Sequence, residues 1–281
     1  MSLIAYEAHG RGTPILFIHG WELSGVYEAT EFEPIFSRIQ ENHYRRIYID
    51  LPGMGNSPAD DKVVDLATML DSVAGFVDEY ISPKRFLLVG TSLGGYLARA
   101  LTTRFGSQVL GVLLKVPLIE PSNERRDVDV ANAIVRNEKA MASIAPSQLH
   151  SLGGDVLVQT PAYIEKLLTK AAIANRTTTE NDNKFLEVIR DDPKRYSLPI
   201  LESGGEAKFE RPALILAGRH DAVVGYRDSL RLLELYPRAS FVALDRGTHF
   251  LPVDEGALVE GLVLDWLRRV EEANAVSIER D

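Results

Sequence analysis

The chain has 281 residues, no cysteine and a formal net charge of −9, with 45% hydrophobic and 25% charged residues. This composition is typical of a globular protein made of one large domain, or of one domain with a sizeable insertion. It excludes disulfides, thiolate zinc sites and a cysteine nucleophile, and the acidic balance argues against a nucleic-acid partner, because such binding draws on clustered Lys and Arg.

The sequence contains no apolar stretch of the length that a membrane span needs, since even the apolar run of residues 109–119 is broken by Lys115 and Pro117. Residues 1–12 lack the basic-then-apolar pattern of a secretory signal. We therefore expect a cytoplasmic protein with no membrane span. Nothing in the sequence reports the oligomeric state, so a homo-oligomer stays open.

Six short apolar runs bounded by turn residues predict buried parallel strands, because such strands show little polar alternation. They are Pro14–Ile18, Arg46–Asp50, Phe86–Val89, Val109–Val116, Ala213–Ala217 and Ser240–Leu244. Amphipathic segments between them predict helices at Val63–Tyr80, Leu93–Phe105, Tyr226–Tyr236 and Ala257–Val270. This alternation predicts an α/β fold with a mostly parallel sheet flanked by helices, and ligands collect at the carboxyl ends of the strands in such sheets.

The alternation stops between residues 118 and 209, where prolines punctuate charged, helix-leaning stretches such as Glu124–Ile144 and Tyr163–Ala174. A clean strand follows this segment, so the insertion interrupts one domain. We expect residues 1–117 and 210–281 to form the core and residues 118–209 to form an inserted helical cap.

The pentapeptide Gly90-Thr91-Ser92-Leu93-Gly94 fits the pattern G-x-S-x-G of a nucleophile elbow. It stands between a predicted strand and a predicted helix, which is where a sharp turn lifts a serine hydroxyl clear of the sheet. Gly90 and Gly94 have no Cβ to clash in the strained backbone of such a turn. A phosphate-binding loop is disfavoured, because the P-loop lysine and the spaced G-x-G-x-x-G glycines are missing. Ser92 is therefore the candidate nucleophile.

With this elbow, the chain resembles the serine-nucleophile, esterase-like branch of the α/β-hydrolase fold superfamily. Three further matches carry the resemblance: His19-Gly20-Trp21 after the first predicted strand, Asp50–Ser57 (DLPGMGNS) after the second, and the turns after the last two predicted strands. The resemblance implies an oxyanion hole made by the backbone N–H groups of Trp21 and Leu93. For His19 we favour a structural role in bracing its loop over proton transfer.

In this fold the catalytic acid and base follow the nucleophile in the order Ser, Asp or Glu, His, each at the carboxyl end of a strand. His249 ends a glycine-bearing turn after the last predicted strand, and Asp221 stands in the turn Gly218–Asp221 after the preceding one. Asp228 and Asp245 lie nearby as alternative acids, with surface or salt-bridge roles as the simpler interpretation. The predicted triad is Ser92, Asp221 and His249.

This triad predicts hydrolysis of a small-molecule carboxylic ester through an acyl-enzyme intermediate, without metal or organic cofactor. A serine at the elbow argues against the dehalogenase and epoxide-hydrolase branches, which use aspartate there. Cleavage of a thioester, a lactone or a carbon–carbon bond on the same triad stays open, as does a ligand sensor with little turnover.

The substrate is expected to carry an apolar acyl or alcohol part and to be selected by the cap. Leu118, Ile119, Tyr163 and Leu167 are candidates to face the pocket. At helical spacing the alternative is that such residues form the cap's own core, which we favour for Tyr163 and Leu167.

Overall fold

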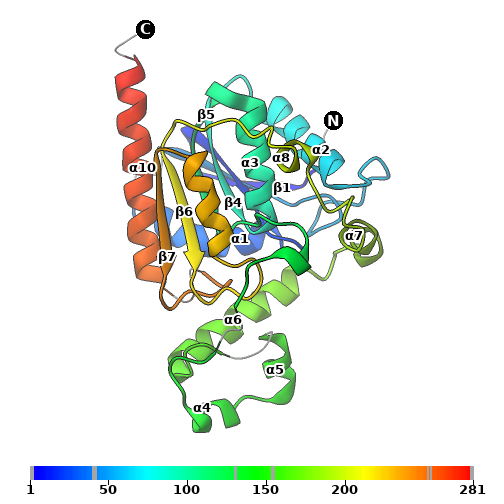
Figure 1. The fold of residues 1–281 in the computed structure, drawn as a ribbon, viewed down its shortest axis with the longest axis vertical. Helices are drawn as coiled ribbons and strands as arrows, with labels where there is room; N and C mark the ends of the chain where they lie inside the picture. The colour runs from blue at the N-terminus through cyan, green and yellow to red at the C-terminus, as the bar shows by residue number, and fades with distance from the viewer. Residues whose placement is uncertain are drawn as a thin grey trace.

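The computed structural model describes residues 3–39, 43–129, 132–152, 156–251, 253 and 255–278. At their centre lies a seven-stranded sheet in the order β1-β3-β2-β4-β5-β6-β7 (Figure 1). β1 runs antiparallel to β3, and the other neighbouring strands are parallel. The strands are β1 Tyr6–His9, β2 Thr13–Ile18, β3 Tyr44–Ile49, β4 Phe86–Thr91, β5 Val109–Lys115, β6 Ala213–Gly218 and β7 Ala239–Leu244. The predicted fold class is thus confirmed.

All six predicted strands are present, and their ends differ from the predicted ones by no more than two residues. The sequence analysis missed β1, an edge strand of four residues whose side chains alternate between exposed and half-buried. A short strand of this kind has no continuous apolar run, so it lacks the signal that identified the others.

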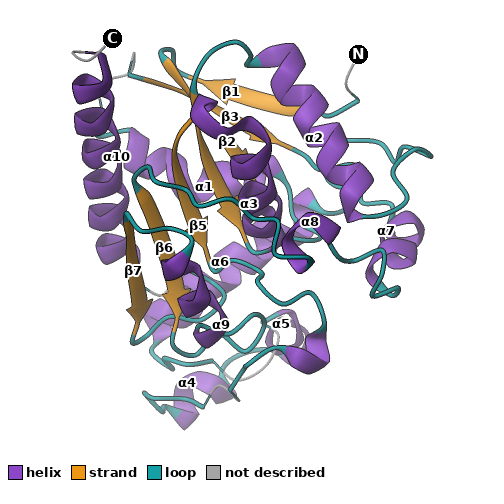
Figure 2. Cartoon of the chain, turned by 45° about the horizontal axis from the view of Figure 1, so that its top comes forward, coloured by secondary structure: helices purple, strands orange, loops and turns teal. Residues whose placement is uncertain are grey.

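Helices cover both faces of the sheet (Figure 2). α1 contacts β2, β3 and α10, whereas α2 contacts α3, which packs on β4 and β5. The helices of this core are α1 Gly25–Phe36, α2 Leu66–Tyr80, α3 Leu93–Phe105, α9 Arg227–Leu230 and α10 Gly256–Ile278, with the 3₁₀ turns η1 Gly106–Gln108 and η3 Arg231–Glu234. The prediction of one continuous helix at Tyr226–Tyr236 is therefore wrong, because α9 ends after one turn and the chain continues as the 3₁₀ turn η3.

Caps in the sequence set where two of these helices begin. The Ser24 hydroxyl accepts the backbone N–H of Tyr27 at the start of α1. At the start of α2, Asp65 and Thr68 form a reciprocal capping box. Such caps satisfy N–H groups that have no partner inside the helix, and each contributes about 1 kcal/mol.

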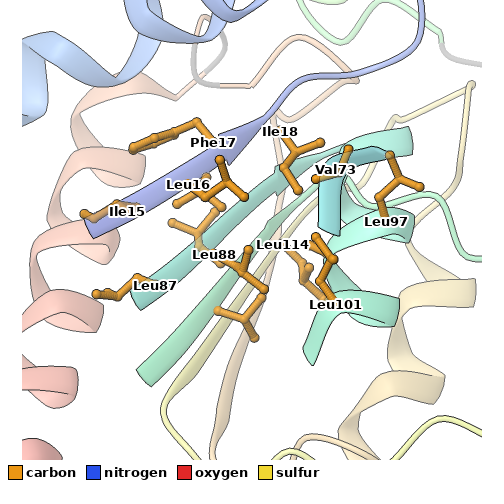
Figure 3. Packing of buried hydrophobic residues seen from close by; sticks show 14 of the residues in the cluster. Ile15, Leu16, Phe17, Ile18, Val73, Leu87, Leu88, Leu97, Leu101 and Leu114 are labelled. Atoms are coloured by element: carbon orange, nitrogen blue, oxygen red, sulfur yellow. The ribbon is translucent and has the colours of Figure 1, made fainter. Parts of the chain in front are cut away.

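Buried hydrophobic side chains of the core fill the space where β2, β4 and β5 meet α2 and α3 (Figure 3). Leu88 and Leu114 from the strands pack near Leu97 and Leu101 of α3, and all four side chains are fully buried. Burying a leucine contributes about 1.5–3 kcal/mol, so this layer fixes the strand ends from which the site is built.

The segment between β5 and β6 contains η2 Asn123–Arg125, α4 Glu138–Ala142, α5 Pro146–Ser151, α6 Pro161–Thr177, α7 Asn183–Arg190 and α8 Pro199–Glu202. α4, α5 and α6 lie beyond the end of the sheet toward which β6 and β7 point (Figure 1). The predicted helix at Tyr163–Ala174 lies inside α6. The prediction that Glu124–Ile144 is largely helical is wrong. Its described part is irregular chain apart from the end of η2 and the five residues of α4.

Side chains of this segment belong to two apolar clusters. Leu186, Ile189 and Leu198, from α7 and the start of α8, pack into the main core. A second cluster is separate from the core and consists of Leu152, Val156, Leu157, Val158, Tyr163, Ile164 and Leu167. The preferred interpretation of Tyr163 and Leu167 as members of a local core agrees with these contacts.

Within the described ranges, no helix has the length and apolar character to cross a membrane.

Candidate active site

Ser92 lies at the junction of β4 and α3 with a backbone φ of 53°, a value that residues other than glycine rarely adopt. The neighbouring glycines explain how the chain accommodates it. A Cβ on Gly90 would collide with the carbonyl of Gly94, and one on Gly94 would collide with the carbonyl of Ile18. The elbow therefore requires glycine at both positions, as the motif predicted.

Hydrogen bonds from neighbouring chain segments hold this strained residue. The Ser92 N–H donates to the carbonyl of Lys115 over 3.0 Å, and the Ser92 carbonyl accepts the N–H of Leu118 over 2.9 Å. Both partners lie at the carboxyl end of β5 or just beyond it. The backbone of this candidate nucleophile is thus fixed from the next strand, which pre-organises the site.

Asp221 and His249 meet at the ends of β6 and β7. Oδ2 of Asp221 lies 2.8 Å from Nδ1 of His249, and Oδ1 of Asp221 accepts the N–H groups of Val223 at 2.8 Å and Val224 at 3.0 Å. Burial alone would raise the pKa of Asp221, but the charge of His249 and the hydrogen bonds outweigh burial and lower it below its ordinary value. This carboxyl is therefore ionised and oriented toward the imidazole.

The loop after β2 brings further backbone to the serine. A Cβ on Gly20 would lie 3.2 Å from Cβ of Ser92, so the two backbones are in close approach. In the described ranges, the N–H groups of Trp21 and Leu93 have no hydrogen-bond partner. Glu22 follows with a φ of 58°, a strained turn that the sequence did not reveal. Free N–H groups at these two places suit the oxyanion hole that the resemblance implied.

His19 has the bracing role that we favoured for it. It is fully buried, with Nδ1 2.7 Å from the carbonyl of Gly20 and Nε2 accepting the N–H of Leu51 over 2.9 Å. Burial lowers the pKa of His19, so the ring is neutral. It ties the loop that carries Trp21 to the end of β3.

A cavity of about 780 Å³ joins these parts, because Gly20, Trp21, Ser92 and His249 all line it. Leu118 lines it too, as the sequence analysis anticipated, whereas Ile119 does not and packs against the core. His249 also lines a second cavity of about 390 Å³. The apolar wall of this second cavity includes Leu152, Val156, Leu157, Tyr163, Leu167 and Phe250.

Beneath the elbow lies a buried charge cluster that the sequence analysis did not find. Lys115 is 1% exposed and pairs with Glu28 and Glu31 of α1, and Lys170 of α6 lies 2.9 Å from Glu31. Burial alone would lower the pKa of Lys115, but the two carboxylates raise it, so the lysine is charged. Thr91, the residue before Ser92, donates its hydroxyl to Glu28 over 3.0 Å. The cluster thus links α1 and α6 to the elbow.

The rejected acids occupy other places. Asp228 is buried and accepts the N–H of Asp127 over 3.0 Å, and Asp245 is exposed. In the part of the chain that the structure describes, no group of three or more histidine, aspartate or glutamate side chains is placed to hold a metal ion.

Comparison with known proteins decides the family, since the alpha/beta hydrolase fold family matches this chain over residues 13–256. The chain belongs to the alpha/beta hydrolase fold family. A pimeloyl-[acyl-carrier protein] methyl ester esterase of Legionella pneumophila (strain Paris) is 31% identical over 254 residues, which cover 88% of this chain and 91% of that protein. The esterase of the same name from Shewanella sp. (strain MR-7) is 26% identical over 190 residues, or 66% of this chain and 61% of that protein.

A solved structure of the same family agrees with the fold. The crystal structure of an alpha/beta superfamily hydrolase from Oenococcus oeni PSU-1 superposes with a TM-score of 0.83 at 28% identity, covering 95% of this chain and 96% of that one. The α/β-hydrolase fold that the sequence predicted is thereby confirmed.

Proposed function

We propose that this chain hydrolyses a small-molecule carboxylic ester through an acyl-enzyme intermediate on Ser92, with His249 as the base and Asp221 as the acid. One observation carries the proposal: His249, whose Nδ1 lies 2.8 Å from Oδ2 of Asp221, lines the same cavity as the strained serine. The named relatives are esterases, and hydrolysis of an ester bond is the activity that this chain shares with them.

In the proposed reaction, His249 takes the Ser92 proton as the hydroxyl oxygen attacks the ester carbonyl. The N–H groups of Trp21 and Leu93 stabilise the oxygen that becomes negative, and one such donor contributes about 3 kcal/mol in comparable enzymes. His249 then protonates the leaving alcohol, and water repeats the cycle on the acyl-enzyme. Asp221 holds the imidazole in the tautomer that this proton transfer needs.

We further propose that residues 118–209 act as the cap that selects the substrate. α4, α5 and α6 lie at the carboxyl end of the sheet, and side chains of the separate apolar cluster wall the second cavity next to His249. An apolar acyl or alcohol part fits such a wall. A location in the cytoplasm is part of the same proposal.

The test is hydrolysis of a panel of methyl and aryl esters of increasing acyl length by the wild type and by Ser92→Ala. We expect turnover that depends on acyl length in the wild type and none above background in a Ser92→Ala protein that melts like the wild type. Stoichiometric ester binding without turnover in the wild type would favour a ligand sensor instead. Thioesters and lactones in the same panel separate the remaining reaction types.

A further inference from the structure

The guanidinium of Arg126 is fixed at the wall of the catalytic cavity. Its Nε donates to the carbonyl of Glu120 over 2.9 Å, Nη1 donates to that of Val223 over 3.1 Å, and Nη2 donates to that of Pro121 over 3.1 Å. A guanidinium has five N–H donors, so two remain after these three bonds. The backbone therefore positions the charge but does not neutralise it.

Arg126 is the cation of this cavity that has no carboxylate partner among the described residues. Lys115 lies between two buried glutamates, and Arg190 pairs with Glu22 at 2.9 Å. Glu124 also lines the cavity, but it is exposed and forms no ion pair with Arg126. Arg126 is half-buried, and this burial lowers its pKa, although the charges of Glu120 and Asp221 act in the opposite direction. A partly desolvated cation with no carboxylate at ion-pair distance favours an anion from outside the chain.

Tyr196 supplies a second donor in the same cavity. Its ring stands edge-on to that of Trp21, with the centroids 5.1 Å apart, and its hydroxyl has no partner within the described ranges. Burial raises the pKa of Tyr196 to about 12, with the charge of Arg126 acting in the opposite direction. The hydroxyl therefore keeps its proton at neutral pH and is free to donate it in a hydrogen bond.

We propose that Arg126 and Tyr196 bind a carboxylate carried by the substrate, so that the preferred ester has an anionic group away from the reacting carbonyl. This inference rests on the proposed ester hydrolysis. A carboxylate accepts two parallel N–H bonds from a guanidinium, and its single charge matches the one guanidinium charge of Arg126. A phosphate monoester carries about two charges at neutral pH and would leave one of them unpaired here.

The decisive measurement compares esters that are matched except for the charge. Monomethyl esters of linear dicarboxylic acids are paired with methyl esters of monocarboxylic acids of equal chain length. We expect kcat/KM to favour the charged member by about 10- to 100-fold at the chain length that spans Ser92 to Arg126, mainly through KM, since a hydrogen bond to a charged group is worth that factor.

Two variants and one control test whether Arg126 and Tyr196 cause the preference for the charged ester. Arg126→Gln should abolish the ratio between charged and neutral esters, and Tyr196→Phe, which removes only a hydroxyl, should reduce it severalfold. Arg125→Gln is the matched control, because Arg125 is the adjacent residue, is exposed, pairs with the carboxylate of Glu120 at 2.7 Å and does not line the cavity. The control should leave the ratio at the wild-type value.

The alternative is that Arg126 only fastens its segment to the loop after β6 through Val223. In that case Arg126→Gln would lower kcat/KM for both members of each pair by the same factor, and the proposal would be overturned. A wild type without preference for the charged ester at any chain length would overturn it as well.

A second measurement keeps this inference separate from the proposed hydrolysis. If the wild type turns over no ester, the proposed function fails, and calorimetric binding of the monomethyl half-esters to the wild type decides the anion site alone. Binding that weakens at least about 10-fold in Arg126→Gln supports the site. Equal binding by the wild type and by Arg126→Gln refutes it.

Discussion

Nδ1 of His249 lies 2.8 Å from Oδ2 of Asp221, and the other oxygen of that carboxylate is held by two backbone N–H groups. The carboxylate is therefore held on both of its oxygens before any substrate arrives. Its environment accounts for the ionised state, because the bonds to it outweigh the effect of burial. This relationship leads directly to the first prediction.

Asp221→Asn should lower kcat by about 10⁴-fold, because the amide favours the wrong imidazole tautomer while leaving the geometry intact. The measurement is ester turnover at saturating substrate, together with a thermal melt to confirm folding. Asp245→Asn is the control, since Asp245 is exposed, and it should retain wild-type turnover. A reversed outcome for the two variants would transfer the role of the acid to Asp245.

Gly94→Ala should prevent the elbow from forming, because its Cβ would collide with the Ile18 carbonyl. We expect a loss of about 3 kcal/mol in the free energy of unfolding, as for overpacked positions, and loss of turnover. Gly75→Ala is the matched control, as a Cβ on that exposed residue of α2 meets nothing within 4 Å. It should stabilise the protein by about 0.5–1 kcal/mol. Urea unfolding of both variants distinguishes steric collision from a general effect of alanine.

Glu33→Gln should destabilise the protein in a pH-dependent manner. Glu33 binds Arg46 through two hydrogen bonds, at 2.9 and 2.7 Å, and accepts the Tyr48 hydroxyl at 2.7 Å. Burial alone would raise the pKa of Glu33, but these bonds lower it. A carboxyl with a lowered folded-state pKa stabilises the protein above its unfolded pKa and loses that contribution as pH falls through the folded pKa.

The free energies of unfolding of wild type and Glu33→Gln should therefore differ by about 1 kcal/mol at neutral pH, after allowance for partial exposure, and should converge in acid below about pH 4. Urea unfolding at pH 7 and pH 3 measures this. Glu272→Gln, at an exposed pair on α10, is the control and should change little at either pH. A constant gap at both pH values would contradict the assigned pKa direction.

Leu167→Ala should change the order of preference among acyl chains. Leu167 walls the apolar cavity beside His249, so truncation enlarges the space for a chain there. Leu168→Ala is matched to it, because Leu168 packs on the same cluster but does not line the cavity. Both variants should lose stability, whereas only Leu167→Ala should shift the preference toward longer or bulkier esters. The same order in all three proteins would place selection in the loops of the core.

The sequence predicted most of the sheet because its buried parallel strands are continuous apolar runs, and β1 was missed because it is not. α1 was also missed: Pro34 lies inside it and three glutamates stand within it. Two of these glutamates are buried because Lys115 and Lys170 compensate them, and such pairing across distant elements has no signature in a linear sequence.

The candidate triad could be named in advance because each member stands at a strand end in a fixed order along the chain. The position in the sequence was therefore enough to predict these residues without knowing which side chains are in contact. Arg126 and Tyr196 could not be named in this way. They lie outside regular helices in the segment between β5 and β6. What sets Arg126 apart is that its guanidinium bonds to backbone carbonyls and pairs with no carboxylate in the described ranges, which only the folded chain reveals. Polar residues outside motifs become candidates only when their surroundings are known.

The most direct test of the account is the site of modification by a small fluorophosphonate, mapped by peptide mass spectrometry. The account predicts one adduct, on Ser92, formed near neutral pH and absent from Ser92→Ala, because a serine with a paired base is the strong nucleophile among the hydroxyls. An adduct on another serine, or equal labelling of wild type and Ser92→Ala, would contradict the assignment of Ser92 as the nucleophile.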